Sequence, residues 1–250
     1  MWHIFSIDPA WAIGGAVLLG LGVGRFLAKW AYCLPLSMER DWLLQIQTYL
    51  DQDVTVPPVA SDRELGRSGR QAHSVVIPIL TSGLFGLCAW RFGASIVAIC
   101  AMGFCAALIT LSWIDARTRL LPDVITLPLL WAGLLINLND VFTSLPMAVL
   151  GAAVGYLSLW VLFHFFRFLT GQEGMGYGDF KLVAAMGAWF GLAALPFLVL
   201  VSSFAGVLGA LVMYRSRHVD KGITLPFGPY LALSGVLALF FPMSWVGMWV

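Results

Sequence analysis

The feature that most constrains this chain is the run from Leu182 to Tyr214, which contains no charged residue. A helix of about 20 apolar residues is long enough to cross a lipid bilayer, so this run is too long for one comfortable span. Gly187, Gly191 and Pro196 offer a break near its middle. We therefore expect two membrane helices here, joined by a short turn.

The rest of the chain is apolar in the same way. Of its 250 residues, 60% are hydrophobic and only 11% are charged, whereas a soluble domain carries about 25% charged residues. This composition excludes an ordinary soluble domain. It predicts an all-α, polytopic membrane helical bundle of about eight transmembrane helices in a lipid bilayer. A net charge of +1 gives no reason to expect nucleic-acid binding.

One polar segment, residues 33–73, separates the first apolar run from the others. Its residues 38–53 have helical spacing that predicts an amphipathic helix. The chain then divides into a first span (1–32), a cytoplasmic loop (33–73) and a membrane core (74–250). The expected spans are residues 9–32, 74–90, 92–114, 124–139 and 141–166, two within 182–214, and 226–250.

The positions of Lys and Arg predict the orientation, because these residues concentrate in cytoplasmic loops. If the N-terminus is outside, all of the 14 Lys and Arg residues except Arg91 fall on the inner side. We therefore expect both termini outside, and both Asp115 and Asp179 at the cytoplasmic face.

Asp179 lies in a glycine-rich turn, Gly174 to Lys181, between two apolar runs. A carboxylate beside a membrane span is costly, so it is a candidate functional residue. Two aspartates that meet in a folded bundle can hydrolyse a peptide without a metal: the ionised one takes a proton from water and the protonated one donates to the carbonyl oxygen. Like charges this close cannot both ionise, so the pair shares one proton.

The residues alone leave the partner of Asp179 open between Asp115 and Asp123. Asp123 follows Pro122 and precedes a span, where an N-cap or turn role is natural. Asp115 ends a span, and a position at the membrane interface or a pairing with a nearby arginine is its simpler explanation.

A metal site and an ion-binding site are the alternatives to a catalytic pair. No cluster of His, Cys, Asp and Glu has metal-ligand spacing, so no metal is expected. A secondary transporter with an ion-binding aspartate pair is the alternative to an enzyme. It predicts carboxylates near mid-membrane and an internal repeat, and the sequence shows neither.

Three blocks of residues follow one another along the chain: Ile114–Asp115 with Leu120–Trp131, Gly174–Leu182, and Leu225–Tyr230. Together they resemble the type IV prepilin peptidases, also called prepilin leader peptidase/N-methyltransferases. The G-x-G-D element in the second block is typical of this group of aspartic proteases.

This resemblance implies a multi-pass enzyme of the bacterial inner membrane with its active site on the cytoplasmic side. Its partners would be type IV prepilins and type II secretion pseudopilins, from which it would remove the leader peptide. It would then methylate the new N-terminus, with S-adenosylmethionine as methyl donor.

The resemblance also assigns the site. Asp115 and Asp179 are the implied catalytic pair, both within the 74–250 core, and Asp123 is the second choice. The glycines of the turn would let an extended peptide approach Asp179. The residues of this turn motif are Gly174, Gly176, Tyr177, Gly178 and Lys181.

The chain departs from the family pattern in its first loop. Many members have two C-x-x-C pairs there, a zinc site, whereas residues 33–73 contain only Cys33. We therefore expect no zinc, and a loop held by its amphipathic helix instead.

Overall fold

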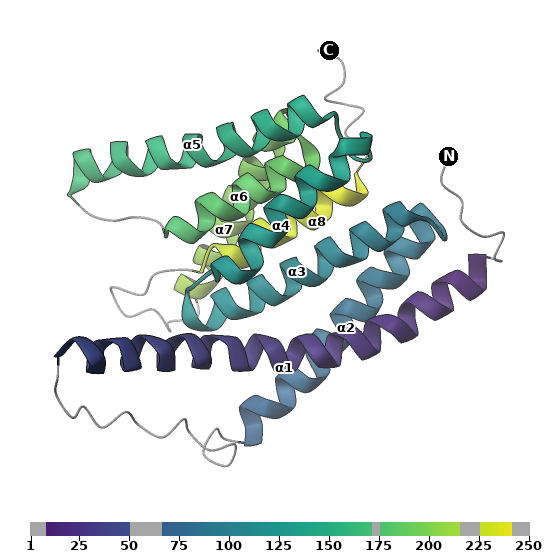
Figure 1. Cartoon of the computed structure of the whole chain (residues 1–250), viewed down its shortest axis with the longest axis horizontal. Coiled ribbons are helices and arrows are strands. Elements are labelled where there is room, and N and C mark those ends of the chain that lie inside the picture. Colours follow the sequence, from purple (N-terminus) through teal and green to yellow (C-terminus); the bar gives the residue numbers. More distant parts are fainter. Residues whose placement is uncertain (1–8, 51–66, 172–175, 216–225, 242–250) are drawn as a thin grey trace. The chain divides into compact units, whose positions relative to one another are not determined.

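The computed structural model describes residues 9–50, 67–171, 176–215 and 226–241, and within these ranges the chain is helical without a β-strand. This confirms the all-α prediction. Figure 1 shows the helices in chain order. They are α1 (Pro9–Leu50), α2 (Arg67–Phe92), α3 (Ile96–Thr118), α4 (Asp123–Ile136), α5 (Leu145–Thr170), α6 (Tyr177–Phe190), α7 (Leu195–Arg215) and α8 (Gly228–Phe240), with short 3-10 turns after α4 and α6.

Five described segments are long and apolar enough to cross a membrane: Ala10–Ile46, Val75–Phe92, Ile96–Thr118, Leu145–Thr170 and Leu192–Val212. Helices α4 and α6 have 14 residues each, and α8 has 13. The chain is therefore a multi-pass membrane protein. The count of eight spans and the sides of the termini remain predictions.

Helix α1 continues to Leu50, past residue 33, where we expected a loop to begin. The helix continues because this part of the chain has few residues that break helices: no glycine follows Gly24, and Pro35 is the only proline after Pro9. The part of the predicted amphipathic helix from Met38 to Leu50 is thus a continuation of α1, and residues 51–53 lie outside the described residues.

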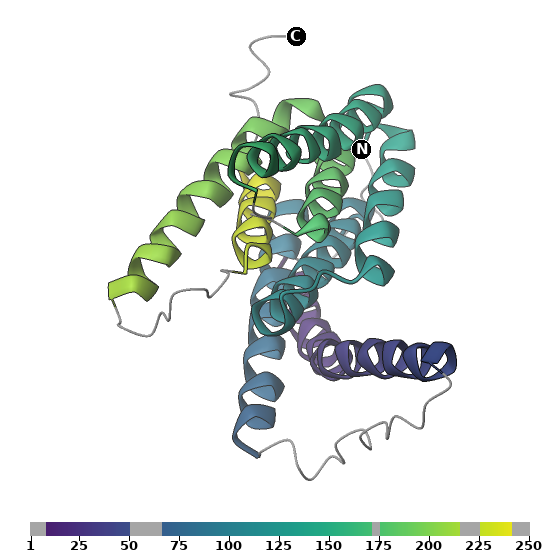
Figure 2. The ribbon, with the colours of Figure 1, turned by 90° about the vertical axis from the view of Figure 1, so that its left-hand side faces the viewer.

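The chain divides into two compact units, residues 1–110 and 111–250, and the division falls within α3. The division expected from the sequence, at residues 32 and 73, follows changes in polarity rather than contacts, and it stays a prediction. In the first unit, α1 and α2 pack at close range, as both ribbon views show (Figures 1 and 2). The backbone of α2 leaves no room for a Cβ at Gly20 or Gly24 of α1.

The break expected within residues 182–214 is confirmed at Gly191. Helix α6 ends at Phe190, and Gly191 has a φ of +80°, a conformation that a residue with a Cβ rarely adopts. A Cβ there would also lie 2.6 Å from Oγ1 of Thr143. The turn is therefore fixed both by backbone geometry and by its neighbour.

Helix α6 is the buried centre of the second unit. Almost every residue from Asp179 to Trp189 is buried, and the helix contacts α4, α5, α7 and α8. Gly151 of α5 and Gly187 of α6 touch backbone to backbone. Small residues let membrane helices approach this closely, and packing then replaces the hydrophobic effect as the stabilising interaction.

Asn137, fully buried just after α4, ties the far end of α6 in place. Its amide donates to the carbonyl oxygens of Ala188 and Trp189, at 2.8 and 3.0 Å. Its own oxygen accepts the N–H groups of Phe142 and Thr143, at 2.9 and 3.2 Å. All four hydrogen-bonding positions of the side chain are used, so its burial carries no penalty for an unpaired polar group.

We predict that Gly187→Ala lowers the stability of the protein by about 1–3 kcal/mol, the usual cost of forcing an extra methyl group into a packed core. The methyl would meet the backbone at Gly151 and Ala152. The measurement is the thermal unfolding midpoint in detergent, followed by the loss of helical circular dichroism. Gly83→Ala in α2 is the control, because a Cβ there has nothing within 4 Å. Equal midpoints for the two variants would contradict the close packing of α5 on α6.

Candidate active site

Asp179 lies in the first turn of α6 and is only 7% exposed. The turn begins at Gly176, which has an extended conformation and accepts the Asp179 N–H at 3.2 Å. Asp179 precedes the uncharged run that starts at Leu182. The sequence therefore brings a carboxylate to the end of the most buried helix, where little water can stabilise its charge.

Asp115 lies in the last turn of α3 and is 5% exposed. Its Oδ2 accepts a hydrogen bond of 2.8 Å from the N–H of Gly228, the first residue of α8. The ends of three helices, α3, α6 and α8, thus contribute to one part of the second unit.

The two carboxyl groups interact electrostatically. The pKa of Asp179 is raised from its ordinary value of 3.8 to about 7, first by burial and then by the negative charge of Asp115. A backbone hydrogen bond at Gly176 acts in the opposite direction. Because this pKa lies near neutral pH, the pair can hold one proton there, which is the state that acid–base hydrolysis requires.

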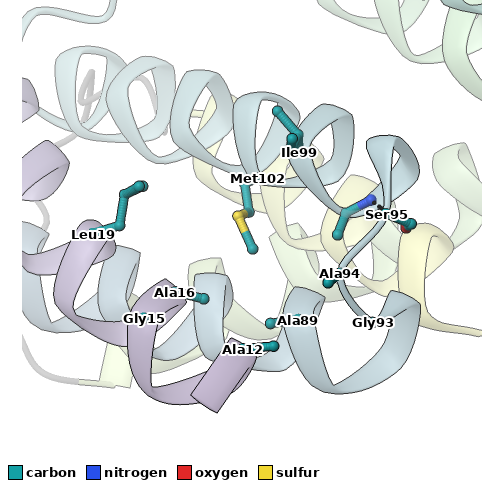
Figure 3. Close-up of a pocket in the computed structure, with 11 residues that line it drawn as sticks. Ala12, Gly15, Ala16, Leu19, Ala89, Gly93, Ala94, Ser95, Ile99 and Met102 are labelled. Atoms are coloured by element: carbon teal, nitrogen blue, oxygen red, sulfur yellow. Dashed lines mark hydrogen bonds between the residues drawn. The ribbon is translucent and has the colours of Figure 1, made fainter. Parts of the chain in front are cut away.

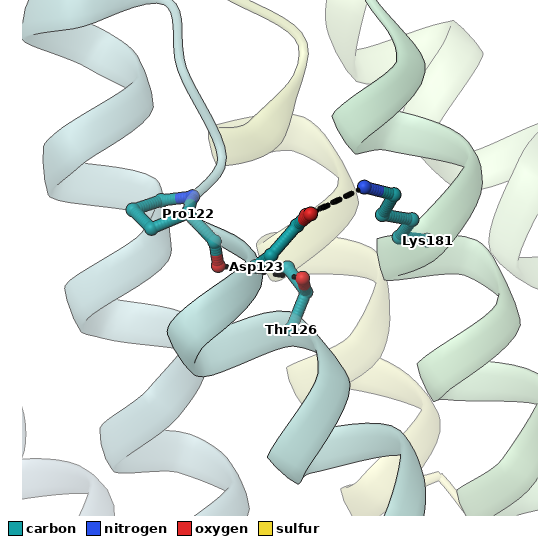
Figure 4. A network of polar contacts seen from close by, with 4 residues as sticks. All are labelled: Pro122, Asp123, Thr126 and Lys181. Atoms are coloured by element: carbon teal, nitrogen blue, oxygen red, sulfur yellow. Dashed lines mark hydrogen bonds and ion pairs between the residues drawn. The ribbon is translucent and has the colours of Figure 1, made fainter. Parts of the chain in front are cut away.

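Asp123 is the first residue of α4 and occupies a different environment. Both of its carboxylate oxygens bind the ammonium group of Lys181, at 2.6 and 2.7 Å (Figure 4). Its side chain is 51% exposed and that of Lys181 is 30% exposed. Asp123 is thus bound to a cation at the surface, whereas Asp115 is buried and its charge acts on Asp179, so the geometry favours Asp115 as the partner of Asp179.

The chain is similar to known proteins over nearly its whole length. The model of the type IV leader peptidase family matches residues 102–211, which include both Asp115 and Asp179. The prepilin leader peptidase/N-methyltransferase of Pseudomonas putida is 40% identical, over 96% of this chain and 94% of its own. That of Neisseria gonorrhoeae is 40% identical, over 92% and 91%, and that of Dickeya chrysanthemi is 41% identical, over 89% and 90%.

The chain belongs to the type IV leader peptidase family. No solved structure matches it. The resemblance seen in the three sequence blocks is thus confirmed over nearly the whole length.

The residues of the turn motif around Asp179 differ from one another in burial and in contacts. A Cβ at Gly178 would lie 2.7 Å from Cβ of Leu121, so this glycine allows α6 to pack against the segment before α4. Gly176 is exposed and has room for a Cβ. Tyr177 is 47% exposed and its ring contacts Phe163, at 5.2 Å between centroids. Gly174 lies outside the described residues.

Gly228 is the site residue to which the sequence analysis gave no role. It belongs to the third block that carries the family resemblance, Leu225–Tyr230. The sequence signal for it was a glycine between Pro226 and Pro229. Prolines make the backbone stiff there, so a flexible glycine is unexpected unless another group must approach it closely.

The cavity between α1, α2 and α3 does not fit S-adenosylmethionine, the methyl donor implied for the family. It has a volume of about 260 Å³, and nearly all of its lining residues are apolar, such as Ala16, Leu19 and Met102 (Figure 3). Its one hydroxyl, on Ser95, is used within the turn, because it donates to the Phe92 carbonyl and accepts the Ala98 N–H. A ribose and an amino acid need several polar partners, which this cavity lacks.

No group of three or more His, Cys, Asp or Glu side chains is placed to hold a metal ion in the described part of the chain. Cys33, the only cysteine of the first polar segment, is exposed and free.

We predict that Asp123→Asn changes the free energy of unfolding by less than about 1 kcal/mol, because exposed ion pairs contribute little. The thermal midpoint is measured at low salt and at 1 M salt. The small difference between the variant and the wild type should shrink at high salt, where the charges are screened. The variants Lys181→Gln and Asp123→Asn/Lys181→Gln complete a double-mutant cycle. A coupling energy well above 1 kcal/mol would show that the pair is buried rather than exposed.

Proposed function

We propose that this protein is a membrane aspartic endopeptidase that removes the leader peptide from type IV prepilins and type II secretion pseudopilins. The observation that carries the proposal is the pair of buried, electrostatically coupled aspartates, Asp115 and Asp179. Family membership supports it, because relatives that align with about nine-tenths of the chain or more are named prepilin leader peptidase/N-methyltransferase.

The geometry suggests that Asp115 acts as the general base and Asp179 as the general acid. Asp115, ionised, takes a proton from a water molecule, and the water oxygen attacks the scissile carbonyl carbon. Asp179, protonated, donates its proton to the carbonyl oxygen, so that a neutral gem-diol forms. The proton on Asp115 then passes to the leaving amine as the C–N bond breaks, and Asp179 recovers a proton from the gem-diol. No metal is required for this sequence.

The chemistry of a prepilin fits the place of the two aspartates in the chain. A prepilin has a polar leader followed by an apolar helix, and the apolar helix would lie in the bilayer beside the membrane spans. Both aspartates are at helix ends near basic residues such as Arg117, Arg119 and Lys181. Because basic residues mark the cytoplasmic side, we place cleavage at the cytoplasmic face of the inner membrane.

Methyl transfer to the new N-terminus, with S-adenosylmethionine as donor, is the second activity that we propose, on the basis of the relatives' names. The cavity of the first unit is not its site, for the reason given above. Cleavage must come first, because it creates the amine that is methylated. A secondary transporter with an ion-binding aspartate pair is not favoured, since the matching family and relatives are named for peptidase activity.

We predict that Asp115→Asn and Asp179→Asn each reduce cleavage of a prepilin-like peptide by at least about 100-fold, the usual contribution of one acid–base group. Asp123→Asn should stay within about fivefold of the wild type, a factor that corresponds to about 1 kcal/mol. The measurement is the rate of leader release by the purified protein in detergent. Full activity of either buried variant, or loss of activity in Asp123→Asn alone, would contradict the assignment of the pair.

A pH dependence of stability follows from the raised pKa of Asp179. Between about pH 4 and pH 7 the folded protein holds a proton on Asp179 that the unfolded chain has already released. Stability from this group is therefore complete below about pH 4, is lost as the pH rises to about 7, and is then constant.

We therefore expect Asp179→Asn, which cannot ionise, to gain in thermal midpoint relative to the wild type as the pH rises from about 4 to about 7. The midpoints of both proteins are compared at each pH. The control is Asp123→Asn, whose side chain is half-exposed and should give no comparable rise. A constant difference between Asp179→Asn and the wild type would mean that Asp179 ionises normally in the folded protein.

A further inference from the structure

The first turn of α8 lies directly against Asp115. In the segment Pro226 to Tyr230, the two prolines have no N–H, and the Tyr230 N–H is bonded to the Phe227 carbonyl at 3.1 Å. The N–H of Gly228 belongs to the first turn of a helix, where no partner within the helix exists. It donates instead to Oδ2 of Asp115, at 2.8 Å.

The approach is so close that only glycine fits. A Cβ at residue 228 would lie 2.7 Å from Oδ2 of Asp115 and 2.9 Å from its Cγ. Gly228 and Asp115 are both buried, so neither can turn toward solvent to relieve the contact. The absence of a side chain at residue 228 is therefore what allows the backbone to reach the carboxylate.

The donor is held on a rigid element. The Leu231 N–H also bonds to the Phe227 carbonyl, at 3.1 Å, and Leu231 is fully buried. On the other side, the rings of Phe227 and Tyr230 lie against Gly206 and Gly209 of α7. The start of α8 is thus fixed between the core and α7. The Gly228 N–H can therefore hold the Asp115 carboxylate in a fixed place.

We propose that Gly228 is a positioning residue of the active site, whose backbone N–H holds the carboxylate of Asp115 in the orientation that faces Asp179. This inference rests on the proposed peptidase function. Gly228 acts through Asp115 and does not touch the substrate. By binding Oδ2, the amide leaves Oδ1 as the oxygen that takes the proton from water. A donated hydrogen bond at a helix N-terminus also stabilises the ionised form that this role needs.

The kinetic test uses Gly228→Ala, which keeps the N–H but inserts a methyl group against Asp115. We expect kcat for a prepilin-like peptide to fall by about 10- to 100-fold, because a displacement of about 1 Å in a catalytic group costs that much. KM should stay within about twofold, since Asp115 and not substrate binding is disturbed. Gly103→Ala in α3 is the matched control, because a Cβ there has nothing within 4 Å. An unchanged kcat, or a loss confined to KM, would overturn the proposal.

A second test does not depend on peptidase activity. Hydrogen exchange is followed by mass spectrometry for the peptide that contains residues 226–231, in the wild type, in Asp115→Ala and in Asp115→Asn. Asp115→Ala should exchange about one additional amide rapidly, because Gly228 loses its acceptor. Asp115→Asn keeps an oxygen at the same place and should stay protected. Equal exchange in the wild type and Asp115→Ala would overturn the proposal, as would an increase that extends equally over α6 and α7.

The two tests separate the two proposals. If the wild-type protein does not cleave the prepilin-like peptide, the proposed function fails, and the exchange experiment still decides whether Gly228 holds Asp115. If the wild type cleaves the peptide and Gly228→Ala cleaves it equally well, the function stands and the positioning role fails.

Discussion

The interaction on which the rest of the structure depends is the repulsion between two carboxyl groups that are both removed from water. Asp115 is 5% exposed and Asp179 is 7% exposed, and the negative charge of Asp115 makes the ionisation of Asp179 less favourable. An unrestrained pair would separate or turn to solvent. Its persistence requires helices that cannot move apart and donors that stabilise one ionised member. The contacts of α6 and α8 supply these two requirements.

Helix α6 is rigid because it is packed through small residues and tied at its far end. Gly151 of α5 meets the backbone at Gly187, and Asn137 bonds the carbonyl oxygens of Ala188 and Trp189. In a membrane the lipid is as apolar as the core, so close packing and hydrogen bonds stabilise helix contacts. Asp179 stands at the opposite end of this helix. Its position is therefore set both by these contacts at the far end of α6 and by the close approach of Gly178 to Leu121 beside it.

Local sequence predicted the elements well where the signal itself was local. The turn at Gly191 was predictable because an uncharged run longer than one span must break, and glycine accepts the positive φ that the turn uses. The continuation of α1 to Leu50 was not predicted, because the chain becomes polar near Cys33 and this change suggested a loop. A helix can continue through polar residues, however, as long as few of them disfavour helical backbone geometry. The resemblance selected Asp115 over Asp123 as the partner of Asp179. The structure adds a physical distinction, because Asp123 is exposed and bound to Lys181.

The sequence by itself determined that this chain is a helical membrane protein, that a carboxylate stands at the start of a buried helix, and which aspartates are candidates for its partner. These properties depend on composition, periodicity and neighbours along the chain. Only the tertiary structure decided that the N–H of Gly228 reaches Asp115, 113 positions earlier in the chain. That contact depends on how helix ends far apart in the sequence meet, and no local pattern encodes the distance between them.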